Sequence, residues 1–266
     1  LPRAVVASIA EPLTAGVQTG SVVKGAKTFA LTWDGALGLV SQNAKERTVF
    51  YKQVANVLGV IDDPATGEMI ANRLGGMLAE NPQLNQKMSR YFVRTGLVTL
   101  TNAQRRSSMR VMLQYLAEIS AEYQDANTSD KSKKRIQNIL QDYGIHSFHR
   151  DQFTKWMAES RNNQFKMPNI EEIQENAGQL SDMGKLLATA VGRMVDETIQ
   201  NPKLIDRPLY AEHPLGRLVY GIQSFLRAYT RNVLIGSGKK IVREYQDNGF
   251  ISGTTMTAIQ MLPNFL

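Results

Sequence analysis

Apolar residues recur at every third or fourth position along most of this chain, which is the spacing of one face of an α-helix. The pattern is clearest after Pro214. The apolar stripe of this segment comprises Leu215, Leu218, Val219, Ile222, Phe225, Leu226, Tyr229 and Val233. Arg217, Arg227 and Arg231 fall outside the stripe. The pattern therefore predicts an amphipathic helix over residues 215–235 that buries one face and presents cations on another.

The same spacing predicts helices in the rest of the chain, and glycine or proline marks many of their ends. We expect helices over residues 45–60, 67–79, 82–94, 101–123, 132–143, 148–159 and 181–201, with a further turn or two over 170–176. Pro202, Pro208 and Pro214 predict an extended connector over residues 202–214, because proline disfavours helical geometry in the residue before it. Alternating strand patterns are scarce. The predicted fold is therefore all-α, an elongated multi-helix array or bundle of amphipathic helices.

Individual residues predict where the helices begin and end and which faces they bury. Thr101 lies three residues before Gln104, a capping-box spacing that predicts a helix start. The inward face of that helix is predicted to hold Met109, Met112, Leu113, Leu116, Ile119 and Tyr123, with Arg105, Arg106 and Arg110 outside it. Gly59 and Gly144 are predicted helix stops. The last strong stripe holds Met183, Leu186, Leu187, Ala190, Val191, Met194, Val195 and Ile199.

A polar stretch from Gln124 to Ser132 marks a soft boundary between two regions. We expect an N-terminal helical region over residues 1–126 and a C-terminal helical region over 127–266, which includes the proline-rich connector and the basic helix. The chain starts on Leu1 and ends on an apolar run at Leu266, so we interpret it as part of a longer polypeptide.

Composition excludes some chemistry and indicates a class of partner. The chain has no cysteine, which excludes disulfides, thiolate nucleophiles and sulfur-ligated metals. Its formal net charge is +7. The segment from Pro202 to Tyr245 contains eight basic and three acidic residues, which gives it a formal net charge of +5. Such an uneven basic surface attracts nucleic acid, anionic lipid headgroups or acidic proteins without choosing among them.

No uncharged apolar run approaches the roughly 18 to 20 residues that a membrane-spanning helix requires. The nearest candidate runs from Val22 to Val40 and carries Lys24, Lys27 and Asp34. It is better interpreted as a surface or partner helix.

Candidate catalytic and metal-binding motifs are incomplete. Gly236-Ser237-Gly238-Lys239-Lys240 resembles the end of a phosphate-binding loop, but it lacks the first glycine and the final hydroxyl and follows a helix. His146, His149 and Asp151 could contribute metal ligands, but a polar turn before the helix of Phe153 and Trp156 is the simpler interpretation. The acidic pairs Asp62-Asp63 and Glu171-Glu172 are better explained by a turn and a helix start. We therefore predict no catalytic residue, no cofactor and no metal site.

Two basic sets are candidates for binding nucleic acid or an anionic surface. The first is the run Lys131, Lys133, Lys134 and Arg135, for which a solvated helix start is the simpler interpretation. The second combines Arg217, Arg227 and Arg231 with Lys239, Lys240 and Arg243. Aromatic residues are interleaved with the second set, as in protein surfaces on which nucleic-acid bases stack. The same spacing is also typical of aromatic residues on the buried face of a helix. The residues predicted to pack this helix against other subunits are Leu218, Ile222, Phe225 and Tyr229.

Three segments together form a recognisable pattern. They are Arg94-Thr95-Gly96-Leu97 with the arginine-rich helix after it, Tyr143-Gly144-Ile145 with Phe153-Thr154-Lys155-Trp156, and Asp206-Arg207-Pro208 through His213-Pro214-Leu215-Gly216-Arg217 to Ser224-Phe225. This pattern resembles a helical module of very large bacteriophage proteins, namely the internal virion or ejection proteins and related large polyvalent proteins. The similarity runs from about Tyr91 to Leu234 and is one of pattern rather than of strict motif.

The resemblance implies a structural virion protein and no enzyme, since none of the matching residues is catalytic in the family. It implies a location in the capsid interior or portal region, and then in the host cell envelope on ejection. It implies homo-oligomers that form a conduit for the phage genome with other ejection proteins or with portal and tail components, and contact with genomic DNA or the host envelope membrane. Two alternatives stay open: a helical nucleic-acid-binding module without a conduit role, and an enzyme whose pocket the sequence does not announce.

Overall fold

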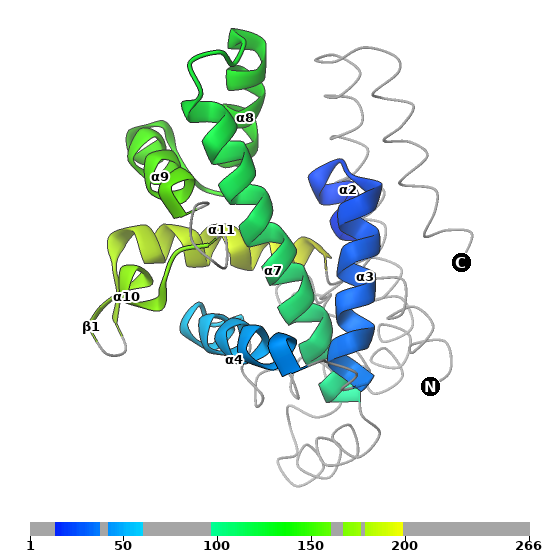
Figure 1. Ribbon diagram of the computed structural model, residues 1–266. Coiled ribbons are helices and arrows are strands. Elements are labelled where there is room, and N and C mark those ends of the chain that lie inside the picture. The colour runs from blue at the N-terminus through cyan, green and yellow to red at the C-terminus, as the bar shows by residue number, and fades with distance from the viewer. Residues whose placement is uncertain (1–13, 38–41, 61–96, 161–166, 177–178, 199–266) are drawn as a thin grey trace, which may run out of the picture. The chain divides into compact units, whose positions relative to one another are not determined.

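The computed structural model describes residues 14–37, 42–60, 97–160, 167–176 and 179–198, and this part of the chain is all-α with one small two-stranded sheet (Figure 1). The predicted multi-helix fold class is confirmed. In order, the elements are α2 (Thr14–Thr19), α3 (Val22–Leu37), α4 (Gln42–Val57), α7 (Leu97–Gln124), α8 (Asp130–Asp142), α9 (Ser147–Ser160), α10 (Ile170–Ile173), β1 (Gln174–Asn176), β2 (Gln179–Leu180) and α11 (Asp182–Thr198).

The chain divides into two compact units. The first unit comprises Leu1–Leu37, Asp62–Gln104 and Asp196–Leu266, and the second unit comprises Gly38–Ile61 and Arg105–Val195. Each unit is described separately below. The division into residues 1–126 and 127–266 stays a prediction.

Helix α7 forms the centre of the second unit. Met109, Met112, Leu113 and Leu116 are all fully buried, and Ile119 is nearly so, which confirms the predicted inward face at these five residues. Tyr123, the sixth predicted residue, is half-buried. Val111, Tyr115 and Ala117 are buried as well, although they lie on other sides of the helix. Neighbouring elements therefore cover α7 on most of its circumference, as expected of a central helix rather than a surface helix.

The predicted start of this helix is wrong. α7 begins at Leu97, so Thr101 and Gln104 lie inside the helix instead of capping it. Both side chains are buried. No glycine or proline separates Leu97 from Thr101, so nothing in this stretch stops helical geometry from extending four residues further upstream.

The turn between α8 and α9 is closed by a left-handed glycine. Gly144 has φ +89°. Its N–H donates to the Gln141 carbonyl at 3.0 Å, and the Ile145 N–H donates to the Leu140 carbonyl at 2.9 Å. This pair of bonds is the Schellman motif, which satisfies the last carbonyls of a helix. Gly59 ends α4 with the same two bonds, so both predicted stops are confirmed.

The end of α7 is bonded to both α8 and α9. The Tyr123 hydroxyl donates to the Asp151 carboxylate at 3.2 Å and accepts from the Gln137 amide at 3.3 Å. Gln124 donates to the Thr154 hydroxyl at 2.7 Å. The apolar residues buried in the α8–α9 part of the unit are Ile136, Leu140, Tyr143, Ile145, Phe153 and Met157.

Helix α4 packs against α7 through two arginines of α7. The Arg105 Nε donates to the Val60 carbonyl at 2.6 Å, just beyond the end of α4. The Arg110 guanidinium lies 4.6 Å from the centroid of the buried Tyr51 ring, within the range of a cation–π interaction. Tyr51, Val54 and Ala55 of α4 are buried, whereas Val49 is 56% exposed.

A short connector leads from α10 into α11. Glu172 of α10 accepts a hydrogen bond from the Asn169 N–H at 2.9 Å, which supports the interpretation of Glu171-Glu172 as a helix start. The segment predicted as one or two further turns is a single turn followed by β1, which pairs antiparallel with β2. The predicted stripe of α11 is confirmed at Leu187, Ala190, Val191, Met194 and Val195, which are buried. Met183 and Leu186 are half-buried, and Ile199 lies outside the described residues.

In the first unit, α2 and α3 form a tight helical hairpin. The turn is made by Gly20 and Ser21, whose N–H donates to the Gly16 carbonyl at 2.9 Å. Gly16 and Gly25 lie so close that a Cβ on Gly16 would come within 3.2 Å of the Gly25 Cα. The absence of side chains at these two positions lets the helices approach each other.

Two glycines of α11 offer a matched test of packing. A methyl group at Gly184 would overlap the carbonyl oxygen of Ile173, whereas one at Gly192 would meet nothing within 4 Å. We predict that Gly184→Ala destabilises the protein by about 1–3 kcal/mol, because backbone must shift. Gly192→Ala should stabilise it by about 0.5–1 kcal/mol, because alanine favours the helix.

Urea unfolding of both variants, followed by circular dichroism, measures the two free energies. Equal changes in the two variants would show that α11 does not approach Ile173 as described.

Candidate functional site

The six basic residues predicted to bind nucleic acid or an anionic surface lie outside the described residues, and so do the four predicted packing residues. They are Arg217, Arg227, Arg231, Lys239, Lys240 and Arg243, and Leu218, Ile222, Phe225 and Tyr229. The connector over 202–214 and the helix over 215–235 lie outside them too. All of these stay predictions.

The other predicted basic set opens helix α8. Lys131 and Lys134 are exposed, and Lys133 and Arg135 are half-buried. Ser129 caps the helix, since its hydroxyl accepts from the Ser132 N–H at 3.2 Å. The cap places the four cations in the first two turns of α8.

This placement brings like charges together. The start of a helix carries a partial positive charge, so a cation there costs about 0.3–1 kcal/mol when exposed. Asp130 in the first turn offsets part of this cost. Asp125 also adjoins, but its carboxylate accepts the Asn127 N–H at 2.9 Å and so closes the loop before α8. A phosphate group would be attracted by both the cations and the helix start.

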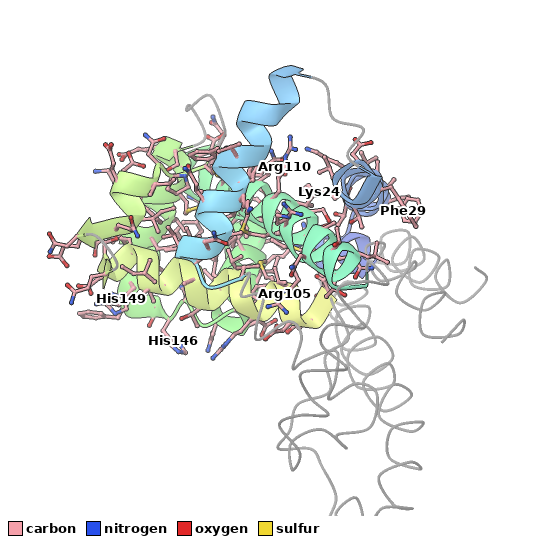
Figure 2. All side chains as sticks on the ribbon, turned by 90° about the horizontal axis from the view of Figure 1, so that it is seen from below. Lys24, Phe29, Arg105, Arg110, His146 and His149 are labelled. Atoms are coloured by element: carbon pink, nitrogen blue, oxygen red, sulfur yellow. The ribbon has the colours of Figure 1, made fainter. Side chains whose placement is uncertain are left out.

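The histidines at the start of α9 do not form a metal site in this part of the chain. Asp151, the third member of the candidate group, accepts its hydrogen bond from Tyr123. Within the described ranges, no three side chains of the His, Asp and Glu types gather around one point. His146 and His149 lie at the outer edge of the group of described helices (Figure 2).

A salt bridge lies at the start of α11. Lys185 donates to the Asp182 carboxylate at 2.9 Å, and both side chains are exposed. This hydrogen bond and the lysine charge lower the pKa of Asp182, with a small contribution from His149, and the same bond raises the pKa of Lys185. Solvent screens such a pair, so it is a helix-start contact rather than a tuned acid.

The arginines of α7 contribute to packing. Arg105 and Arg110 bind the carbonyl of Val60 and the ring of Tyr51 (Figure 2). These two arginines therefore contact other parts of the protein. The exposed lysines of α8 are better candidates for binding an external anion.

The sequence patterns did not single out one exposed aromatic residue. Phe148, in the first turn of α9, is 89% exposed and lies edge-on to His149. On α3, in the segment interpreted as a surface or partner helix, Val22 and Val23 are 48% and 76% exposed. Exposure depends on which distant segments cover a residue, so spacing alone carries little signal for it.

No protein-family model matches the chain, and no match is found among curated proteins or solved structures. Among the described helices, none combines the length and the apolar content needed to cross a bilayer.

We predict that the start of α8 binds DNA through phosphates. Lys131→Glu with Lys134→Glu should weaken binding to a DNA duplex and lower the slope of log affinity against log salt by about 2, about 1 for each lost contact. A salt-titrated mobility shift measures both quantities.

The control is Lys52→Glu with Lys155→Glu, which changes two exposed lysines on α4 and α9 by the same total charge. If both double variants lose affinity equally, net charge rather than the start of α8 governs binding.

Proposed function

We propose that this chain is a structural virion protein of the ejected internal class, which forms homo-oligomers that act as a conduit for phage genome delivery across the host envelope. The observation that carries the proposal is the pattern from Arg94 through Tyr143-Gly144-Ile145 to Ser224-Phe225, which resembles the helical module of such proteins. On this proposal the chain is no enzyme. It resides in the capsid interior or portal region before ejection, with other ejection proteins or portal and tail components as partners.

The described part of that pattern supports a role as scaffold. Tyr143 and Ile145 are buried at the turn after α8, and Phe153 is buried in α9. Met109 and Leu113, on the arginine-rich helix, are buried as well. These residues hold helices together, which is what a helical building block requires.

The charge distribution supports contact with phosphates. Basic residues outnumber acidic ones by five between Pro202 and Tyr245, where the predicted helix carries Arg217, Arg227 and Arg231. A conduit wall that faces DNA or anionic lipid requires such an excess of cations.

A second candidate function is a helical nucleic-acid-binding module without a conduit role. The cations at the start of α8 favour it, because they form a basic surface on a compact unit without any assembly. The two functions differ in oligomeric state. Size-exclusion light scattering followed by a salt-titrated DNA shift separates ordered oligomers from a DNA-binding monomer or dimer.

We predict that charge reversal at Arg227 and Arg231 lowers retention on DNA and on anionic vesicles, with the largest effect at low salt, since exposed charges are screened within about 10 Å at 0.1 M salt. Co-sedimentation over a salt series measures the loss. Unchanged retention at low salt would contradict a role for these two arginines.

The conduit itself is tested by imaging the chain in virions and in ejected particles. Several copies arranged in a ring around an axis are expected. Single copies without lateral contacts would rule out the conduit and leave the binding module.

A further inference from the structure

Helix α3 carries valine and alanine on its exposed side and glycine and threonine on its buried side. Its buried positions include Gly25, Thr28 and Thr32. In a helix that packs on a protein core the order is normally the reverse.

Both buried threonines of α3 form hydrogen bonds within the helix. The Thr28 hydroxyl donates to the Lys24 carbonyl at 2.8 Å, and the Thr32 hydroxyl donates to the Thr28 carbonyl at 2.8 Å. A hydroxyl that bonds to the carbonyl four residues back is a local way for a helix to bury threonine.

The outer side carries a continuous apolar stripe, which we call the α3 stripe. At 100° per residue its members cover a sector of about 120°, the width of a face that helices normally bury. The α3 stripe consists of Val22, Val23, Ala26, Phe29, Ala30 and Trp33. Val23 is 76% exposed and Ala26 and Ala30 are exposed, while Phe29 and Trp33 are half-buried and contact each other edge-on at 6.1 Å between ring centroids.

We propose that the α3 stripe binds the surface of a lipid bilayer, with α3 lying parallel to the membrane. An apolar helix face with aromatic residues, bordered by lysine, is typical of helices that lie in the membrane interface. Lys27 and Asp34 are exposed along one edge of the stripe, beside Val23 and Ala30, whereas Lys24 leaves the helix on a different side from Phe29 (Figure 2). Lys27 can extend to the headgroups while its methylene groups lie along apolar surface.

The size of the α3 stripe favours a bilayer over a second copy of the chain. A helix of 16 residues is about 24 Å long. A strip of that length and about 10 Å wide covers roughly 250 Å², whereas a stable protein interface buries about 800 Å² on each partner. Pairing through α3 alone therefore falls short by about threefold. A bilayer has no such minimum area, because binding grows with whatever apolar area is inserted.

Fluorescence of Trp33 tests the proposal directly. The chain has two tryptophans, so Trp156→Phe leaves Trp33 as the only reporter. We expect vesicles of phosphatidylcholine with phosphatidylglycerol to shift the Trp33 emission to the blue, and lipids brominated in the acyl chain to quench it. Pure phosphatidylcholine vesicles determine whether anionic headgroups are required. Emission that neither shifts nor is quenched with either vesicle type would overturn the proposal.

A matched pair of variants tests the residues. Val23→Asp should reduce partitioning into vesicles about tenfold or more, because a buried valine is worth about 1.5 kcal/mol or more and 1.4 kcal/mol is a factor of ten. Aspartate in the first turn of a helix is favourable, so α3 should remain folded. Val49→Asp makes the same change at an exposed valine on α4 and should leave partitioning unchanged.

The outcomes are separable from those for the proposed function. Arg227→Glu with Arg231→Glu tests the basic helix, and its effect disappears at high salt, whereas insertion of the α3 stripe persists there. Equal partitioning of the Val23→Asp and Val49→Asp proteins would overturn the proposal. A lipid-free change of mass by light scattering in Val23→Asp would also overturn it, because the stripe would then be a contact between copies.

Discussion

The central constraint on the second unit is that α7 must be covered on most of its sides. A helix with one apolar face can rest on a single neighbour, but Val111, Met112 and Leu113 are consecutive and all buried. Consecutive residues point 100° apart, so no one helix can cover all three. The contacts described for α4, α8 and α9 follow from this requirement. Their own polar faces can then remain in water.

Polar side chains of α7 also bind its neighbouring helices, and these contacts determine which cations an external ligand can reach. Tyr123 and Gln124 bind α8 and α9, and Arg105 and Arg110 bind α4. The two arginines are thereby used inside the unit, although both contribute to the net charge. The sum of charges in a sequence therefore overstates the cations that an external ligand can reach. The start of α8 differs, because exposed lysines gather there against the preference of the helix dipole.

Much of the described fold could be predicted from spacing, and the failures have physical reasons. Most of the buried stripes of α7 and α11 could be predicted because the apolar positions of a packed helix repeat every 3.6 residues. The start at Thr101 was wrong because a capping sequence also fits inside a helix when the preceding residues continue it. The strand pair was missed since two or three residues are too few for an alternating pattern.

The candidate site could be predicted less well. The composition indicates a basic protein that binds anionic partners, and the resemblance indicates a protein that forms homo-oligomers. The predicted binding residues after Pro214, however, lie outside the described part of the chain. The α3 stripe shows the general difficulty. The sequence favours a surface or partner helix here, but only the burial of Thr28 and Thr32 shows which side of the helix is covered and which side is exposed.

The second unit is assembled from two separated stretches, Gly38–Ile61 and Arg105–Val195. During synthesis α4 therefore leaves the ribosome before α7, the helix whose arginines contact it. Tyr51 can form its contact with Arg110 only after α7 has been made. Contacts between distant parts of a chain slow folding, since loop closure has to precede them. The nascent protein should consequently keep α4 unprotected until α7 has left the ribosome, a period in which chaperones can bind α4.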